Sequence, residues 1–333
     1  MTNLLLILAM AALVALGVTP LAGRLATRVG VVDRPHPRKL HLEPIPLLGG
    51  LAIYVALILA LLLFSEQRFI AELVSILVGA SLVSFLGVWD DRWGLRPLLK
   101  LGGQALAASL LFAFGVQVAV MNNAVLNYLV TVMWVLGITN ALNLLDNMDG
   151  LSGGIAAVAA GFFLLLAALN GQYLVGSLAA ALTGACLGFL RYNFNPARIF
   201  MGDAGSLFLG FLLAAVGIKL RFPAHPVIIT WMIPLIVLGL PIFDTVLVII
   251  SRTRRGINTL TNPGQDHVSH RLVRLGLSQR EAVMLLYILS GLLGMMGILL
   301  TLVGVVEAYL IAGLLTLAAL IALIRLECVP LPR

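Results

Sequence analysis

The sequence predicts an all-α integral membrane protein with about eleven transmembrane helices. Hydrophobic residues make up 61% of the 333 residues and charged residues only 11%, against about 25% charged residues in a typical soluble domain. The mean hydropathy is +1.09. A soluble fold of this size could not bury so much apolar surface, so the surrounding solvent must be lipid. We expect residues 1–333 to form a single polytopic membrane domain.

Eleven apolar runs are long enough to span a bilayer as helices, which requires roughly 17–25 residues. They are residues 4–22, 46–64, 70–88, 98–119, 122–144, 150–169, 172–190, 203–220, 226–250, 281–303 and 306–324. The runs are continuous and do not alternate, which excludes a β-barrel. No positively charged segment precedes the first run, so we interpret it as the first helix and not as a cleaved signal peptide.

The basic residues lie almost entirely on one side of these runs. All 21 Lys and Arg residues except Arg68, Lys219 and Arg221 fall in the odd-numbered loops, beside those loops or at the C-terminus. The positive-inside rule then places the N-terminus outside and the C-terminus in the cytoplasm. The net charge of +7 is interpreted as a topology signal and a contact for anionic lipid, not as a nucleic-acid surface.

Carboxylates gather on the same predicted face, although acidic residues contribute little to orientation. They are Asp90, Asp91, Asp146, Asp149, Asp203 and, within the ninth run, Asp244. The simpler interpretations remain open: a solvated helix end for the first pair, an N-cap for Asp203, and a structural hydrogen bond for Asp244. The functional interpretation of Asp203 is a metal ligand beside a helix N-terminus that attracts phosphate.

Two further segments carry polar groups at this face. In NALNLLDNMDGLSGG, Asn143 precedes two acids spaced three apart, which share one face if the segment is helical; the alternative is a polar hinge. In HVSHRL, His267 and His270 have the same spacing, and Arg271 follows; the alternative is a solvated basic loop. No further His or Cys lies nearby to complete a zinc site.

The first cytoplasmic loop carries Lys39 and His41, which could simply be topology charge. The predicted cytoplasmic loops, about 23–45, 89–97, 145–149, 191–202 and 251–280, would form an active-site face. Carboxylates with basic groups suit Mg²⁺ and phosphates, because Mg²⁺ takes one or two carboxylates plus substrate oxygens. Neither a P-loop nor a GxGxxG motif is present, so neither ATP nor a dinucleotide is indicated.

At these residues the chain resembles the polyprenyl-phosphate N-acetylhexosamine-1-phosphate transferase family, of the glycosyltransferase 4 type. The matching blocks occur in family order over residues 38–272: RKLHLEPIPLLGG, DDRWGLRPLLKLGGQ, NALNLLDNMDGLSGG, RIFMGDAGSLFLG, PIFDTVLVIISRTRRG and DHVSHRL. The first and last blocks resemble the WecA/TagO-like branch, which uses UDP-N-acetylglucosamine. The peptidoglycan branch, which uses UDP-MurNAc-pentapeptide, has a triple-histidine run where this chain has His-Val-Ser-His.

The resemblance implies transfer of a sugar 1-phosphate from a UDP-N-acetylhexosamine to undecaprenyl phosphate, the first membrane step of a cell-envelope glycan. The products would be undecaprenyl-pyrophosphoryl-sugar and UMP. Mg²⁺ is the implied cofactor, with Mn²⁺ as the alternative metal. The implied location is a bacterial cell membrane with a cytoplasmic active site. A homodimer is one oligomeric state that stays open.

The resemblance also implies roles for the matching residues. The metal ligands would be Asp203, Asp90 and Asp91. The catalytic residues would be Asp90, Asp91, Asp149, His267 and His270. The substrate-binding residues would be Lys39, His41, Asn143, Asp146, Asp244 and Arg271. A phosphate monoester is largely ionised at neutral pH, so positioning and charge neutralisation should contribute more than a strong base.

Two other classes of protein account for the sequence less well. A transporter would suit the intramembrane acids, but these acids lie at one face and not near the midplane, where transporter sites are found. An intramembrane protease would need a His within a helix to activate Ser152, and all the His residues lie in loops.

Overall fold

The computed structural model describes residues 2–33, 44–64, 70–258 and 264–329, and the all-α membrane architecture is confirmed. The described helices are α1 (Thr2–Val29), α2 (Gly49–Phe64), α3 (Ile70–Trp93), α4 (Pro97–Ala113), α5 (Ala124–Leu145), α6 (Leu151–Leu169), α7 (Tyr173–Asn193), α8 (Gly202–Lys219), α9 (Val227–Val237), α10 (Gly239–Arg254), α11 (Val268–Arg274), α12 (Gln279–Leu300) and α13 (Val305–Glu327). Over the same described ranges the strands are β1 (Val32–Asp33) and β2 (Ile45–Pro46).

Each of the eleven apolar runs coincides with a helix or a helix pair. Of the helices in the described ranges, 8 are long and apolar enough to cross a membrane, or 9 if α9 and α10 form one bent span. Helices α2 and α4 have 16 and 17 residues and are shorter than the rest. The protein is therefore a multi-pass membrane protein, while the count of eleven spans and the orientation stay predictions.

The ninth run is broken in the structure. Helices α9 and α10 meet at an angle of 75°, with Leu238 between them. Pro241 explains the break, because proline has no N–H to donate to the carbonyl of Val237 and its ring crowds that carbonyl.

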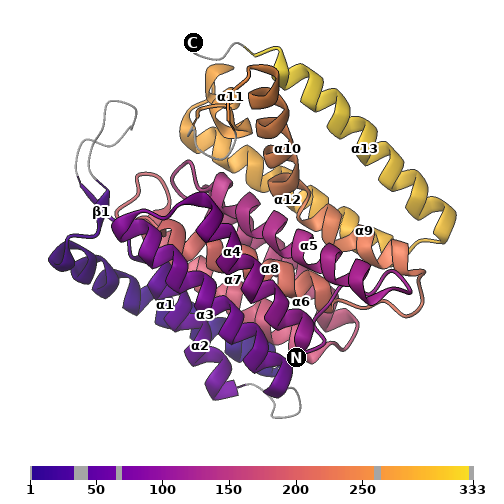
Figure 1. Ribbon diagram of the computed structural model, residues 1–333, viewed down its shortest axis with the longest axis horizontal. Coiled ribbons are helices and arrows are strands. Elements are labelled where there is room, and N and C mark those ends of the chain that lie inside the picture. The colour runs from indigo at the N-terminus through magenta and orange to yellow at the C-terminus, as the bar shows by residue number, and fades with distance from the viewer. Residues whose placement is uncertain (1, 34–43, 65–69, 259–263, 330–333) are drawn as a thin grey trace. The chain divides into compact units, whose positions relative to one another are not determined.

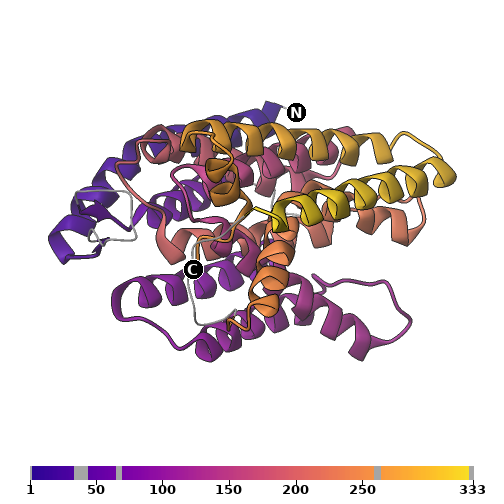
Figure 2. The same ribbon diagram turned by 90° about the horizontal axis from the view of Figure 1, so that it is seen from above.

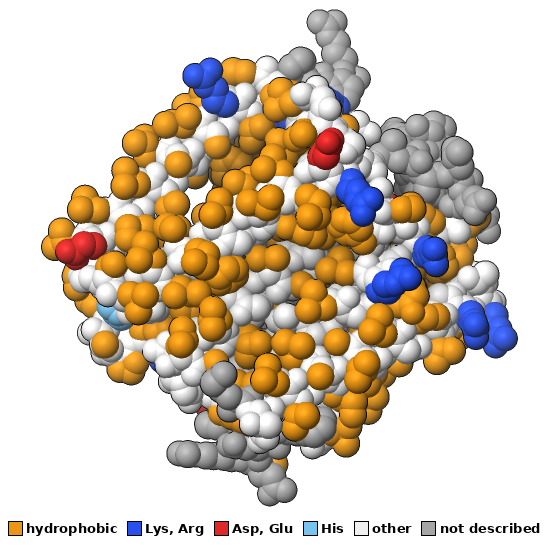
Figure 3. All heavy atoms as spheres, turned by 180° about the vertical axis from the view of Figure 1, so that it is seen from behind, with side chains coloured by type: hydrophobic (Ala, Val, Ile, Leu, Met, Phe, Trp, Pro, Cys, Tyr) orange, Lys and Arg blue, Asp and Glu red, His pale blue; other side chains and the backbone are white. Residues whose placement is uncertain are grey.

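The chain divides into two compact units, Met1–Lys219 and Leu220–Arg333. Helices α7 and α8 form the core of the first unit, and almost every side chain of α8 from Ala204 onward is buried. Around this core α1, α2 and α6 pack on α7, and α3 and α5 pack on α8 (Figure 1). Hydrophobic side chains dominate the face of the molecule in Figure 3, as expected for a surface in contact with lipid.

Glycines allow α8 to approach its neighbours backbone to backbone. A Cβ added to Gly87 of α3 would overlap the backbone of Ala204, and one added to Gly210 of α8 would overlap Thr139 of α5. Small residues allow such close approach between membrane helices, where association depends on packing and hydrogen bonds. The start of α8 is thereby fixed against the end of α3.

The second unit contains α9 to α13. Helix α12 packs against α9, α10 and α11 and begins at a capping box in which Ser278 and Glu281 cap each other's backbone N–H groups. Figure 2 shows α12 and α13 joined by a turn at one end. Helix α13 contacts α9, α10 and α12, yet Ala308 is its one buried side chain in the described residues.

Candidate active site

In the first unit, Asp91 caps α8 from the neighbouring helix. Its carboxylate accepts hydrogen bonds from the backbone N–H groups of Asp203 (2.9 Å) and Ala204 (3.1 Å). These groups have no partner within α8, because the first N–H groups of a helix never do. Gly202 precedes them with a φ of 67°, and a side chain there would collide with the Asp91 carboxylate. Asp91 thus fixes the direction in which α8 presents Asp203.

Lys100 joins the two remaining acids of this cluster. Its Nζ lies 3.0 Å from Oδ2 of Asp90 and contacts Oδ2 of Asp203. It also donates to Oδ1 of Asn143 over 3.3 Å. The ammonium group stands between carboxylates from α3 and α8 and offsets their mutual repulsion.

Asn143 attaches the end of α5 to the same cluster. Its Nδ2 donates to Oδ1 of Asp203 (2.8 Å) and to Oγ of Ser206 (2.9 Å). One turn earlier, Asn140 donates to the buried Gln104 of α4 over 2.6 Å. The amides that the sequence places at membrane depth therefore have different partners, and Asn143 is the one that contacts the acids.

The two acids after α5 have different environments. Burial, followed by the negative charges of Asp203 and Asp91, raises the pKa of Asp146 to about 8. Asp149 instead accepts hydrogen bonds from Nδ2 of Asn195 (3.1 Å) and from N–H of Ala197 (2.9 Å). Asp149 therefore holds the segment that leads into α8.

The first loop is attached to the same segment by its main chain. Strands β1 and β2 form an antiparallel pair. Beyond them, N–H of Phe200 donates to the carbonyl of Pro46, and N–H groups of Gly49 and Gly50 donate to the carbonyls of Phe200 and Met201. Lys39 and His41, the predicted substrate-binding residues of this loop, lie outside the described residues.

In the second unit, Asp244 and His267 form a buried pair. Oδ2 of Asp244 lies 2.7 Å from Nδ1 of His267, and its Oδ1 accepts from N–H of Val268 over 2.7 Å. Asp244 lies in α10, the second helix of the ninth run, and is fully buried. A carboxylate held against Nδ1 directs the other ring nitrogen of the histidine away from itself.

His270 and Arg271 continue this short helix in different ways. The rings of His267 and His270 have centroids 6.0 Å apart. Burial and the neighbouring His267 lower the pKa of His270 to about 4, so it is neutral at physiological pH. Arg271 is fully buried and donates to Ser251 (2.8 Å) and Glu327 (2.6 Å). Both of these partners belong to the protein itself, and the predicted contact of Arg271 with substrate stays a prediction.

Comparisons with known proteins identify the family. A profile described as glycosyl transferase family 4 matches residues 73–221. A probable undecaprenyl-phosphate N-acetylglucosaminyl 1-phosphate transferase from Bacillus subtilis is 36% identical over 287 residues, 82% of this chain and 78% of the relative. The chain belongs to glycosyl transferase family 4. The resemblance to polyprenyl-phosphate N-acetylhexosamine-1-phosphate transferases is thereby confirmed.

Other relatives cover the chain to a similar extent. A decaprenyl-phosphate N-acetylglucosaminephosphotransferase from Mycolicibacterium smegmatis is 34% identical, covering 81% of this chain and 75% of the relative. An undecaprenyl-phosphate alpha-N-acetylglucosaminyl 1-phosphate transferase from Yersinia pestis is 30% identical, covering 84% and 79%.

The acids of this family member suit a hard cation. Within the described residues, no group of three or more His, Cys, Asp and Glu side chains has a ready-made metal-binding arrangement. Asp90 and Asp203 nevertheless share one cationic partner, the Lys100 ammonium. Mg²⁺ takes oxygen ligands, needs only one or two carboxylates, and fills its remaining positions with water and substrate oxygens. The donor set therefore fits Mg²⁺.

Two charged residues, one in each unit, are absent from the predicted site residues, and the same signal marks both. Lys100 lies near the start of α4 and Glu327 at the end of α13. The helix dipole disfavours a cation at an N-terminus and an anion at a C-terminus. A charge at the disfavoured end of an apolar helix indicates a partner from another element.

Proposed function

We propose that this family member transfers N-acetylglucosamine 1-phosphate from UDP-N-acetylglucosamine to undecaprenyl phosphate, releasing UMP. One observation carries the proposal: Asp90 of α3 and Asp203 of α8 converge on a single cationic group at adjoining helix ends. The names of the relatives support the lipid phosphate and the N-acetylglucosamine group. Transfer of UDP-MurNAc-pentapeptide or another UDP-sugar is the alternative for the same site.

The reaction exchanges one phosphorus–oxygen bond for another. An oxygen of the lipid phosphate bonds to the sugar-bearing phosphorus of the UDP-sugar, and the bond from that phosphorus to UMP breaks. The lipid phosphate is largely ionised near pH 7, so Asp90 is asked chiefly to position it and to accept a residual proton. Bound Mg²⁺ would supply neutralisation of the pyrophosphate charge.

The remaining residues divide into holding and contacting groups. Asp203 and Asp90 would hold the metal ion. Asp91 also stays a candidate ligand, although both of its oxygens accept backbone N–H groups of α8. Asn143 would orient Asp203, which it already contacts.

In the second unit, Asp244 would keep His267 in one tautomer, with its second ring nitrogen available to a phosphate. His270 would act as a neutral hydrogen-bonding group, as its lowered pKa requires. We further propose that the protein lies in a bacterial plasma membrane, with these residues at its cytoplasmic face.

The decisive experiment is UMP release by purified protein in nanodiscs. UDP-N-acetylglucosamine, UDP-N-acetylgalactosamine, UDP-glucose and UDP-MurNAc-pentapeptide are each supplied with undecaprenyl phosphate and MgCl₂. We expect UMP only with the lipid phosphate and the divalent ion, and fastest with UDP-N-acetylglucosamine. UMP release that does not require the lipid phosphate, or no UMP release with any of the sugars, contradicts the proposal.

The metal role has its own test. Asp203→Asn should abolish Mg²⁺-dependent exchange of labelled UMP into the UDP-sugar, because an amide oxygen is a weaker ligand for a hard cation. Glu72→Gln is the matched control, since Glu72 pairs with Lys219 at the other end of α8. Wild-type exchange in Asp203→Asn removes this residue from the metal site.

A further inference from the structure

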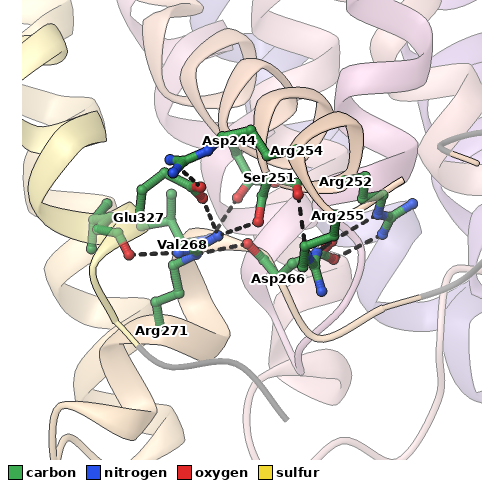
Figure 4. A network of polar contacts seen from close by, with 10 residues as sticks. Asp244, Ser251, Arg252, Arg254, Arg255, Asp266, Val268, Arg271 and Glu327 are labelled. Carbon is green, nitrogen blue, oxygen red and sulfur yellow. Dashed lines mark hydrogen bonds and ion pairs between the residues drawn. The ribbon is translucent and has the colours of Figure 1, made fainter. Parts of the chain in front are cut away.

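Arg271 is fully buried, and its donors are engaged within the chain. Nε donates to the carbonyl of Asp266 (3.0 Å), Nη1 to the carbonyl of Leu326, and Nη2 to Ser251 and Glu327. Each of the guanidinium nitrogens therefore has a protein partner (Figure 4). Arg271 is built into the unit and does not project from its surface.

The buried guanidinium requires a negative charge close by, and Glu327 supplies it. Oε1 of Glu327 lies 2.6 Å from Nη2, and the Glu327 side chain is only 10% exposed. Removing one member of a buried ion pair leaves the other charge uncompensated, which is far more harmful than losing an exposed pair. Glu327 has a second partner, Arg254, whose Nη1 lies 3.3 Å from Oε2 of Glu327. The Arg254 side chain is 69% exposed, so this pair contributes little to stability.

The Arg271–Glu327 pair acts on the segment that carries the histidines. N–H of Arg271 donates to the carbonyl of His267, and its Nε holds the carbonyl of the preceding residue, Asp266. Asp244 binds the other side of the same turn through His267 and Val268. The first turn of α11 is thus held from α10 by Asp244 and from α13 by Glu327.

Buried side chains contribute little to holding this end of α13 in place. Ala308 is its one buried side chain among the described residues, far from Glu327 along the helix. The carbonyl of Leu326 is one of the last in α13; it accepts the N–H of Val329 over 3.0 Å and a further hydrogen bond from Nη1 of Arg271. The side chain of Arg271 therefore binds a helix end by both its carbonyl and its carboxylate.

We propose that Glu327 is a positioning residue, which acts through Arg271 to hold His267 and His270 in their working geometry. This inference rests on the proposed transferase function and adds the end of α13 to the elements that the reaction needs. Arg271 is accordingly a structural link and not a contact to substrate phosphate.

The test compares Glu327→Gln with Arg254→Gln, which removes only the exposed partner of the same carboxylate. We expect Glu327→Gln to lower kcat roughly 10- to 100-fold, the range that a small misplacement of reacting groups produces. KM for the UDP-sugar should stay within about twofold, because no substrate contact is lost. Glu327→Asp should recover part of kcat, and Arg254→Gln should behave as wild type.

Hydrogen exchange provides a readout that does not depend on activity. Backbone amides of residues 266–274 should exchange faster in Glu327→Gln than in wild type, with α1 to α8 unchanged. Unaltered exchange, unaltered kcat, or a defect confined to KM each overturns the proposal. If Glu327→Gln fails to fold, Glu327→Asp takes its place in the test. Wild-type kcat and wild-type exchange in Glu327→Asp would then show that the contact is dispensable. An inactive wild-type protein would refute the proposed function alone.

Discussion

Asp90 and Asp91 are adjacent in α3 but have different partners. Consecutive residues point about 100° apart around an α-helix, so Asp90 and Asp91 face different partners. Asp90 faces Lys100, while Asp91 faces the first N–H groups of α8. A reading of the pair as two equivalent ligands therefore misses that one of them shapes the helix that carries Asp203.

Lys100 should affect catalysis and metal affinity in opposite directions. Lys100→Met keeps the length of the side chain but removes the charge between Asp90 and Asp203. We expect kcat to fall by about 10²-fold, as when one charge-stabilising donor is lost. The half-saturating Mg²⁺ concentration should also fall, since the freed carboxylates attract the cation more strongly.

Both quantities come from UMP release titrated with MgCl₂. Lys219→Met, which breaks the ion pair with Glu72 at the opposite end of α8, is the control and should leave both unchanged. A higher Mg²⁺ requirement in Lys100→Met would be inconsistent with this arrangement.

Asp266 should give the second unit an acid-sensitive component of stability. Burial alone would raise its pKa, but hydrogen bonds and charge from Arg252 lower it from 3.8 to about 2. A lowered pKa stabilises the folded state above the unfolded pKa, and this contribution is lost as the pH falls through the folded value. The difference amounts to about 2 kcal/mol at neutral pH.

Asp266→Asn should therefore lower the melting temperature in detergent at pH 7 but differ less from wild type at pH 3. Glu307→Gln, at an exposed position of α13, should change neither value. A gap between Asp266→Asn and wild type that stays constant with pH would argue against the ion pair as its cause.

At the scale of elements, the sequence predicted the helices better than their joints. Each apolar run became a helix or a pair of helices, because lipid leaves no other way to satisfy the backbone polar groups of a single span. The break at Leu238 had a local signal in Pro241. The short helix α11 did not, because it depends on Asp244 binding N–H of Val268 from a distant part of the chain.

The candidate site was predictable to the same degree. The motifs gathered Asp90, Asn143 and Asp203, which the structure brings into one cluster. Lys100, the cation that links them, has the pattern of a topology signal in the sequence, and Glu327 lies outside the motifs. Both contacts form across helices, so the sequence can indicate that each charge needs a partner but cannot show which residue that partner is.

The close contact between α3 and α8 should be sensitive to a single methyl group. A Cβ at Gly87 would overlap the backbone of Ala204, whereas one at Gly102 of α4 would meet nothing within 4 Å. Gly87→Ala should destabilise the protein by about 1–3 kcal/mol, the usual cost of overpacking. Gly102→Ala should be neutral or slightly stabilising, because alanine favours a helix.

Thermal unfolding in detergent and UMP release measure the two variants. Because Gly87 lies one turn before Asp90, Gly87→Ala should also lose activity at temperatures where it is still folded. Equal stability in the two variants would mean that α3 and α8 do not touch at Gly87.

At the scale of the whole molecule, the orientation predicted from basic residues can be tested with the native thiols. Cys186 is buried and Cys328 is exposed at the C-terminal end of α13. A cytoplasmic C-terminus places Cys328 beyond the reach of a membrane-impermeant maleimide in intact cells or spheroplasts and within its reach in inverted vesicles. Cys328→Ser is the control. Labelling of Cys328 from outside would reverse the orientation.

The ladder between β1, β2 and residues 200–201 has a consequence for protein engineering. Main-chain hydrogen bonds alone connect the two strands that flank the first loop with each other and with Phe200 and Met201, the residues shortly before Asp203. Pro46 fits there because it is asked only for its carbonyl. The anchor leaves no room for a side chain at Gly49 or Gly50, because an added Cβ would overlap the carbonyl of Phe200 or the backbone of Gly205. Variants engineered around this ladder should therefore keep both glycines, since a larger residue at either position would displace the segment that precedes Asp203.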